Sequence, residues 1–531
     1  MPGPTRLLAS LALSFAALAP CANAAGSDAE GELLGRIADP KLGGNERAKA
    51  IRDYIERARA DGRCAAAAAQ LDVIVLERNF PAWLRRVGAE AIAGCADEAT
   101  ARYLAGGIAR GETRERLHAL RAARGLDFPA VEEAARKALS AEDPRVRNEA
   151  AELLARHKAL EAAGELATVV AKGKDRELLE SALHAATELQ RGTAQWPAWE
   201  KRLVEWAGGD DELRRRSAFA ELLADDLDAC SGLALTALAC EDWSARVLAV
   251  AWLTRNPSPG RLDALVARLG EELDNGRVHG DIVRALVELT GVKHLRSQEG
   301  WVRWRQGAGR DWKPGQKVGT NPQGGSSEPR TTAARFYGVE IASARTVFVV
   351  DLSGSMGALS KAPGEEQKKR IDVARGELLQ LVDVLPPGSW FNIVGFGDAV
   401  LPWLDGLAEF SGGKRLRRDE RGELSPAAKK RDEEMRGQAR EFIGRLALAG
   451  STNIYDALEF AFRDPDVDTI CFMTDGTPTA GTETEAIAIR EELVRWNRSR
   501  RIRIHCIAVG EDQPLPKWLA ADHDGVHRFV P

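Results

Sequence analysis

One short segment of the 531-residue chain brings a carboxylate and two hydroxyl groups together. Asp351, Ser353 and Ser355 follow an apolar run over 346–350, which predicts a buried strand. Ligand sites of open α/β sheets lie at the carboxyl ends of the strands, which is where this segment falls. Short oxygen-bearing side chains suit a hard divalent cation and not zinc or copper. The segment therefore predicts a metal-binding loop.

Two distant segments can supply further oxygen atoms to the same site. Thr452 lies just before a predicted helix, and Asp475 follows a predicted strand over 469–474. If that strand neighbours the one before Asp351, the two carboxylates face each other and repel. A bound cation would remove this repulsion. We therefore expect these residues to meet at one edge of a sheet.

The elements that must position these residues alternate between strand and helix over 338–531. Strands are predicted at 346–350, 390–396, 399–404, 469–474, 503–509 and 526–530. Helices are predicted at 370–385, 426–446, 453–462, 483–498 and 516–521. This alternation predicts an α/β domain with a doubly wound, mostly parallel, Rossmann-like sheet. The tight turn at Gly397-Asp398 predicts an antiparallel hairpin at its edge.

Residues 27–305 are helical in pattern and resemble an all-α solenoid of HEAT-like repeats. Helix pairs are predicted to start at Pro81, Thr113, Pro144, Asp175, Asp211, Asp242 and Gly276, at steps of 31 to 36 residues. The pattern Arg147-x-x-Ala150-x-x-x-Leu154 recurs from Arg215 and from Arg246. Ala and Leu four residues apart lie on one helix face, where they can pack between repeats. An irregular helical bundle is the alternative.

The segments at the two ends of this helical region have their own sequence signals, a targeting segment before it and a cap and linker at its end. Residues 1–24 predict a cleaved signal peptide, and no later apolar run is long enough to span a membrane. The protein is therefore expected to be exported, to the periplasm, or to the cell surface or beyond it as a secreted protein; a lipoprotein attached at Cys21 is the alternative. Trp301 and Trp304 are expected to cap the last repeat. Residues 306–337, rich in Gly, Pro and Ser, predict a linker.

Export permits disulfides, and the cysteine positions suggest two of them. Cys64 with Cys95, and Cys230 with Cys240, are the candidate pairs. The two cysteines inside predicted central strands, at positions 471 and 506, are expected to be small buried thiols.

The order of the five oxygen-bearing residues is similar to a known motif. Asp351-x-Ser353-x-Ser355, then Thr452, then Asp475, resembles the metal-ion-dependent adhesion site of von Willebrand factor type A domains. The resemblance implies that Ser353, Ser355 and Thr452 contact the metal directly, while Asp351 and Asp475 act mainly through bound waters. It implies Mg²⁺, with Mn²⁺ or Ca²⁺ as alternatives, and a protein partner that presents an acidic residue to the metal.

The charge balance and the absence of common catalytic motifs restrict the classes of function that the sequence supports. A net charge of −5 gives no support to nucleic-acid binding. The sequences H-E-x-x-H and G-x-S-x-G do not occur, and no general base is evident beside Asp351, so no catalytic residue is assigned. The expected function is non-enzymatic, metal-dependent protein binding. The alternatives are a scaffold in which the repeats bind the partner, and a metal-assisted hydrolase.

Overall fold

The structure is a computed structural model that describes residues 28–77, 79–224, 230–272, 276–317, 334–386, 388–405 and 425–531. The predicted signal peptide, at 1–24, lies outside these residues, as does part of the predicted linker, at 318–333. The chain divides by its internal contacts into two compact units, Met1–His157 and Lys158–Pro531. No helix in the described ranges is both long enough and apolar enough to cross a membrane.

The first unit consists of helix pairs stacked in two rows. The helices are α2 (Asp28–Ala38), α3 (Gly44–Ala60), α4 (Cys64–Val75), α5 (Ala82–Ala93), α6 (Glu98–Arg110), α7 (Thr113–Ala122), α8 (Pro129–Ala138) and α9 (Pro144–Arg156). One row contains α3, α5, α7 and α9, each packed on the next, and the other contains α4, α6 and α8. Such nearest-neighbour stacking is the packing of an α-solenoid.

The second unit begins with helices stacked in the same way. They are α10 (Ala163–Lys172), α11 (Arg176–Gln190), α12 (Trp196–Ala207), α13 (Glu212–Leu222), α14 (Ser231–Ala239), α15 (Trp243–Arg255), α16 (Pro259–Leu269), α17 (Arg277–Thr290) and α18 (Gln298–Gln306). α11, α13, α15 and α17 form one row, and α14, α16 and α18 lie in the other. Trp301 and Trp304 are buried on α18 and meet edge to face at 5.6 Å, as expected for the cap of a repeat core.

The predicted repeat starts are confirmed. α5, α7, α9, α11, α13, α15 and α17 each begin at the predicted residue or directly after it. Four of these helices start with the same kind of cap, because an aspartate side chain accepts a main-chain N–H of the first turn. The capping residues are Asp143, Asp175, Asp211 and Asp242.

The recurrent arginine of the repeats holds the turn before each helix. Arg147, Arg215 and Arg246 each donate from Nη1 to main-chain carbonyl oxygens five or six residues earlier, at 2.7–3.0 Å. Turn carbonyls that would otherwise lack partners are thereby satisfied. The recurrent arginine in the sequence pattern is thus explained by these hydrogen bonds to the turn, and it does not indicate a binding site.

One of the two candidate disulfides forms. Cys64 and Cys95 are joined, with their Cα atoms 6.0 Å apart. Cys230 and Cys240 are free thiols, so that pairing was wrong. They flank the two ends of α14, and a helix of that length separates them by about 14 Å, at about 1.5 Å per residue. A disulfide requires Cα atoms within about 7 Å.

The rest of the second unit, residues 334–531, is called the sheet domain below. Its strands are β3 (Arg345–Asp351), β4 (Trp390–Phe396), β5 (Val400–Pro402), β6 (Thr469–Thr474), β7 (Arg503–Val509) and β8 (His527–Val530). They form one sheet in the order β5-β4-β3-β6-β7-β8. Only β5 is antiparallel, paired with β4 across the predicted hairpin. The predicted doubly wound, mostly parallel sheet is therefore confirmed.

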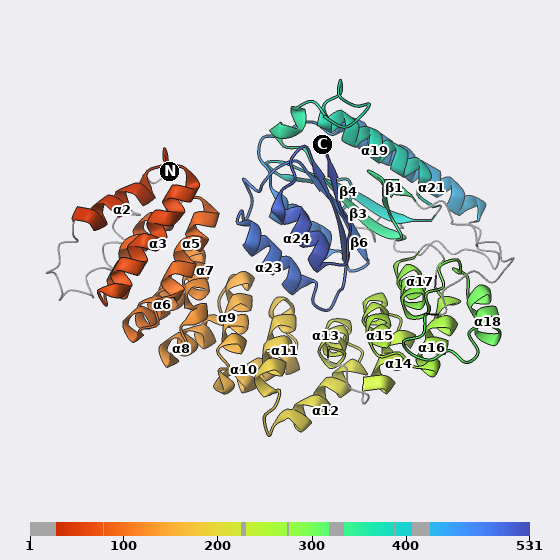
Figure 1. Ribbon diagram of the computed structural model, residues 1–531, viewed down its shortest axis with the longest axis horizontal. Coiled ribbons are helices and arrows are strands. Elements are labelled where there is room, and N and C mark those ends of the chain that lie inside the picture. The colour runs from red at the N-terminus through yellow and green to blue at the C-terminus, as the bar shows by residue number, and fades with distance from the viewer. Residues whose placement is uncertain are drawn as a thin grey trace. The chain divides into compact units, whose positions relative to one another are not determined.

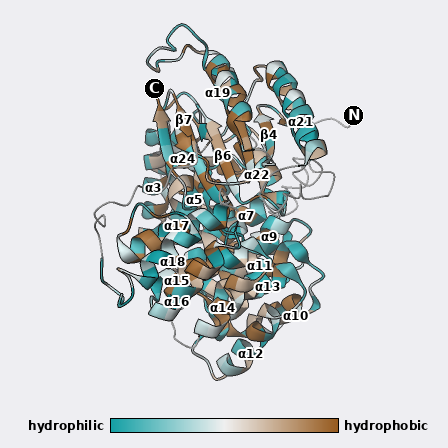
Figure 2. Cartoon of the chain, turned by 90° about the vertical axis from the view of Figure 1, so that its right-hand side faces the viewer, coloured by the Kyte–Doolittle hydropathy of each residue, from teal (hydrophilic) through white to brown (hydrophobic). Residues whose placement is uncertain are grey.

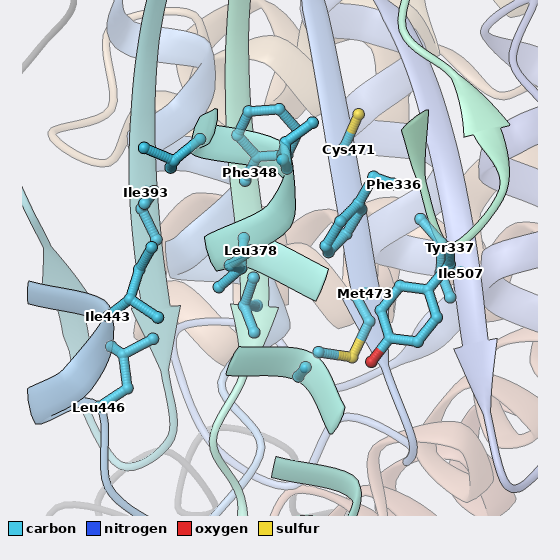
Figure 3. Packing of buried hydrophobic residues seen from close by; sticks show 14 of the residues in the cluster. Phe336, Tyr337, Phe348, Leu378, Ile393, Ile443, Leu446, Cys471, Met473 and Ile507 are labelled. Atoms are coloured by element: carbon cyan, nitrogen blue, oxygen red, sulfur yellow. The ribbon is translucent and has the colours of Figure 1, made fainter. Parts of the chain in front are cut away.

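Helices cover both faces of this sheet (Figure 1). α19 (Arg370–Val384) and α21 (Pro426–Arg445) lie on one face, and α22 (Ile454–Arg463), α23 (Ala486–Trp496) and α24 (Pro514–Asp522) lie on the other. Figure 3 shows the core under α19 and α21, where Phe348, Leu378 and Ile443 pack together. α21 is mainly hydrophilic in Figure 2, as expected for a helix with one face in water.

A short hairpin that the sequence did not predict completes this core. β1 (Arg335–Phe336) pairs with β2 (Val339–Glu340) just before the first strand of the sheet. Phe336 is fully buried, and its ring lies edge to face with that of Phe348, with the ring centroids 5.6 Å apart. Figure 3 shows both side chains in this core. The last residues of the predicted linker therefore contribute to the core of the sheet domain.

Buried charges join α17 to the sheet domain, at the end of the sheet where the parallel strands begin. Asp281 of α17 accepts from Arg277 on its own helix and from Arg503, the first residue of β7, each at 2.7 Å. Arg503 also donates to Asp524 at 2.7 Å, and Arg284 of α17 donates to Asp524 at 3.1 Å. Burial disfavours the charged form of Asp281, but the surrounding guanidinium groups outweigh it and lower its pKa. This ion-pair cluster fixes the sheet domain on the helical repeats.

Two buried histidines near this cluster predict acid sensitivity. Burial lowers the pKa of His505 to about 3 and that of His523 to about 4. Both accept at Nδ1, from the amide of Val526 at 3.1 Å and from the side chain of Asn497 at 2.9 Å, which fits neutral rings. A depressed histidine pKa gives stability that is full above about pH 6.5 and is lost as pH falls toward the folded-state pKa.

We therefore expect urea unfolding to show a loss of stability below about pH 6.5, approaching about 1.4 kcal/mol per pH unit for each ring. The double variant His505→Gln/His523→Gln should lose clearly less stability between about pH 7 and about pH 5. An equal loss in the two proteins would assign the acid sensitivity to other groups.

Candidate functional site

Asp351 lies at the buried end of β3, at the carboxyl edge of the sheet. The side chain is fully buried, and its oxygens accept from the main-chain amide of Ser353 at 2.7 Å and from the hydroxyl of Thr474 at 2.6 Å. Burial raises the pKa of Asp351 to about 6; the hydrogen bonds oppose this shift, and the nearby charge of Asp475 adds to it. The two carboxylates thus interact, and a positive charge near them would be favourable.

Ser353 and Ser355 lie in the loop after β3 and link this loop to Asp475. The hydroxyls of Ser353 and Ser355 are 2.9 Å apart, and Ser355 donates to Asp475 at 2.6 Å. β3 and β6 are parallel neighbours, and Val350 is in register with Met473, so both strands end at the same edge. The sheet therefore places Asp475 opposite the serine loop, as the sequence predicted.

Thr452 reaches the same place from the loop before α22. The main chain holds this loop, because the amide of Gly354 donates to Gly450 O at 3.2 Å and the amide of Thr452 donates to the hydroxyl of Thr479 at 2.8 Å. A Cβ atom added to Gly476 would lie 3.8 Å from the hydroxyl oxygens of both Ser355 and Thr452. Both hydroxyls therefore lie beside Gly476, the residue after Asp475, and all five predicted residues lie at this edge of the sheet.

Arg370 is a site residue that the sequence did not reveal. Its guanidinium, at the start of α19, donates to the second oxygen of Asp475 at 2.8 Å. It lies across Gly510, which has φ of +73°, and a Cβ atom there would come within 2.0 Å of Arg370. Glycine is favoured at position 510 for two reasons: the backbone has a positive φ, and a side chain there would collide with the guanidinium of Arg370. The only sequence signal was a glycine directly after a predicted strand.

Asp398 is a second site residue that the sequence did not reveal. Its side chain holds the loop before α22, which carries Thr452. Its carboxylate accepts from the amides of Gly450 and Ser451, at 3.1 and 2.7 Å, and from the hydroxyl of Ser451 at 2.6 Å. These bonds lower the pKa of Asp398. The sequence identified this aspartate only as part of a turn, although an acidic residue in the edge hairpin could have suggested a role at the neighbouring loops.

The donor set suits a hard cation. Three hydroxyl groups and a carboxylate lie at this edge, with Ser355 exposed and the others buried, and a second, fully buried carboxylate accepts from Thr474 beside them. An all-oxygen set with few charged ligands fits Mg²⁺, which retains several waters of its own. The cation could replace hydrogen bonds that the hydroxyls now make with one another and with Asp475.

Comparisons with known proteins agree with this fold. Residues 344–529 match the family described as von Willebrand factor type A domain. Inter-alpha-trypsin inhibitor heavy chain H4 of Homo sapiens is 28% identical over 198 residues, covering 35% of this chain and 18% of that protein. Heavy chain H1 of Sus scrofa is 28% identical over 181 residues, covering 31% of this chain and 16% of that protein. The chain thus spans less than a fifth of either relative.

A solved structure, the RO (RSR) protein of Deinococcus radiodurans, aligns over 94% of this chain and 84% of its own length, at 16% identity and a TM-score of 0.21. The family match agrees with the strand order and with the parallel pairing of the sheet. Residues 344–529 therefore form a von Willebrand factor type A domain.

Proposed function

We propose that the sheet domain binds a protein partner through a divalent cation, most simply Mg²⁺, at the carboxyl edge of its sheet. Ser353, Ser355 and Thr452 would contact the ion directly, and Asp351 and Asp475 would hold its waters. The observation that supports this proposal is the convergence of the serine and threonine hydroxyls beside Asp475. Neutral hydroxyl ligands leave much of the ion's charge uncompensated, so an open position would attract a carboxylate of the partner.

The cellular setting is part of the proposal. We propose an exported protein of the cell envelope that acts by binding and not by catalysis. The disulfide between Cys64 and Cys95 supports export, because such bonds persist in oxidising compartments.

Isothermal titration of the full chain with Mg²⁺ tests the metal. We expect one-to-one binding that Ser353→Ala weakens by at least about tenfold, since a direct ligand is lost. Ser451→Ala is the matched control, because the Ser451 hydroxyl lies on the same edge but bonds to Asp398. Absence of Mg²⁺ binding by the unmodified protein, or equal affinity in both variants, would contradict the proposal. Titration with Mn²⁺ and Ca²⁺ would rank the three ions by their affinity for the site.

One observation favours the scaffold alternative. Arg370 already pairs with Asp475, so this carboxylate has a positive partner without an ion, and the helical repeats could then bind the protein partner. Pull-down from envelope extracts separates the two functions. Capture that EDTA abolishes and Mg²⁺ restores supports binding through the ion, whereas capture unaffected by EDTA and by Ser353→Ala supports the scaffold.

A further inference from the structure

A cleft in the second unit lies where the helical repeats meet the sheet domain. It has a volume of about 570 Å³ and is lined by α15, α17, the end of α23 and the segments that follow α23 and α24. Ligand pockets commonly have volumes of about 300–1,000 Å³, with apolar walls and a few polar groups. The apolar wall here consists of valines and alanines, of which Val494 is 43% exposed. The cleft is therefore large enough for a small organic molecule.

The charged side chains of this cleft are in part already paired. Five arginines and four acidic residues line it. Asp281 and Asp524 belong to the ion-pair cluster described above. Asp522 accepts from Arg490, which does not line the cleft, at 2.5 and 2.9 Å. Only the exposed Glu288 remains to balance the other arginines, so the cleft favours an anion.

Arg501 carries a positive charge without a partner. The described part of the chain offers its guanidinium no hydrogen bond and no ion pair. Partial loss of water around this group lowers the pKa of Arg501, the charge of Arg255 lowers it further, and Asp524 opposes both. Arg255 is the last residue of α15 and also lines the cleft, where it donates to Leu223 O at 3.0 Å. An anion between the two guanidinium groups would remove their repulsion.

His523 adds a buried hydrogen-bond donor to the same cleft. The side-chain oxygen of Asn497 accepts from the amide of Ile502 at 2.6 Å, so its nitrogen faces Ile502 O at 2.7 Å and His523 Nδ1 at 2.9 Å. Nδ1 therefore accepts, and the proton of this neutral ring is on Nε2. His523 is 5% exposed, and Nε2 has no hydrogen-bond partner among the described residues. Because buried donors are nearly always paired, an acceptor is missing here.

The ring of His523 and the guanidinium of Arg501 belong to one site. Both residues line the cleft. Burial lowers the pKa of His523, and the charge of Arg501 adds to this shift, so the guanidinium lies near the ring. Asn497 positions both, because it bonds to His523 and also accepts the main chain of Ile502, directly after Arg501.

The kinds of group present indicate which ligand would bind. Guanidinium groups and an imidazole N–H are donors only, so the ligand must supply acceptor oxygens. The planar fork of an arginine matches the oxygens of a carboxylate or a phosphate. The valines of the cleft would cover an apolar body attached to such a head group.

We propose that this cleft binds a small organic anion, with its carboxylate or phosphate head between Arg255, Arg501 and His523 and its apolar body against Val250 and Val494. The ligand would then contact both α15 and the sheet domain, and its binding would stabilise the folded second unit. This site is separate from the carboxyl edge of the sheet and needs no metal.

The test uses benzoate and phenyl phosphate as probes, titrated against the full chain in EDTA and followed by saturation-transfer NMR. EDTA removes any cation through which the carboxyl edge could hold a probe. We expect saturable binding of at least one probe, and at least about tenfold weaker binding of phenol, which has the ring without the charge. Binding of only one probe would assign the head group as carboxylate or phosphate.

Arg501→Asn is the decisive variant, and it should weaken the bound probe by at least about tenfold. Residue 501 has φ of +56°, a conformation that asparagine tolerates, so this variant is expected to fold. Arg255→Gln should weaken binding in the same direction. Arg528→Asn is the matched control, because Arg528 is exposed on β8 and does not line the cleft, and it should change nothing.

Each other outcome overturns the proposal. Absence of saturable binding of both probes up to about 10 mM would mean that water alone fills the cleft. Equal affinity in Arg501→Asn and the unmodified protein would place the probe elsewhere. Equal weakening by Arg528→Asn would show attraction by net charge and not a site. Ser353→Ala should have no effect, so failure of Mg²⁺ binding at the carboxyl edge would leave these results unchanged.

Discussion

Asp281→Ala is expected to destabilise the second unit by about 3–5 kcal/mol, because buried Arg277 loses its hydrogen-bonded carboxylate and Arg503 loses one of its two, keeping only Asp524. Arg277 and Arg503 are both largely buried, and each donates to Asp281 at 2.7 Å. Neither can lose its charge easily or reach water. Urea unfolding, followed by circular dichroism, should show the transition at a clearly lower concentration of denaturant.

Two controls separate this effect from a general loss of charge. Arg463→Ala removes a solvent-exposed ion pair with Glu459 in α22, and should cost less than about 0.5 kcal/mol. Replacing Arg277, Asp281 and Arg503 together by apolar residues of similar size should recover most of the lost stability. A small effect of Asp281→Ala, similar to that of Arg463→Ala, would show that water reaches the cluster and that it does not hold the sheet domain in place.

Reduction of the disulfide is the second change with a large expected effect. Cys64 and Cys95 are separated by 31 residues in sequence, and closing a loop of that size removes unfolded-state entropy worth about 3–4 kcal/mol. Hydrogen exchange of α4 and α5 should therefore become much faster when dithiothreitol is added. The double variant Cys64→Ala/Cys95→Ala should exchange fast under both conditions. Unchanged protection of the reduced native protein would mean that helix packing alone holds these repeats.

Much of the fold was predictable because its signals are local. The strands 390–396, 469–474 and 503–509 have the predicted bounds, since buried parallel strands are mostly apolar runs. The repeat helices begin where predicted because their aspartate caps are visible in the sequence.

The site was predictable only where its residues follow such elements. Asp351 is the last residue of β3 and Asp475 directly follows β6, so the pairing of these two strands brings them together. Arg370 is 105 residues from Asp475, and their pairing depends on the space above Gly510, which no periodicity shows. The ion pairs of Asp281 were missed for the same reason. Whether the edge binds a metal remains a prediction that titration must test.

β7 gives the chain a mechanical property. Its first residue, Arg503, is anchored to α17 through Asp281, while the residue after its last, Gly510, supports Arg370 against Asp475. A partner pulling on the carboxyl edge would load β3 and β6 along their axes, and the hydrogen bonds between β6 and β7 would pass part of the force to β7. Tension would then pass into the ion-pair cluster on α17. If the domain binds a partner as proposed, the binding site and the ion-pair cluster lie at opposite ends of the same parallel sheet, and the weaker of the two sets the load that the protein can bear.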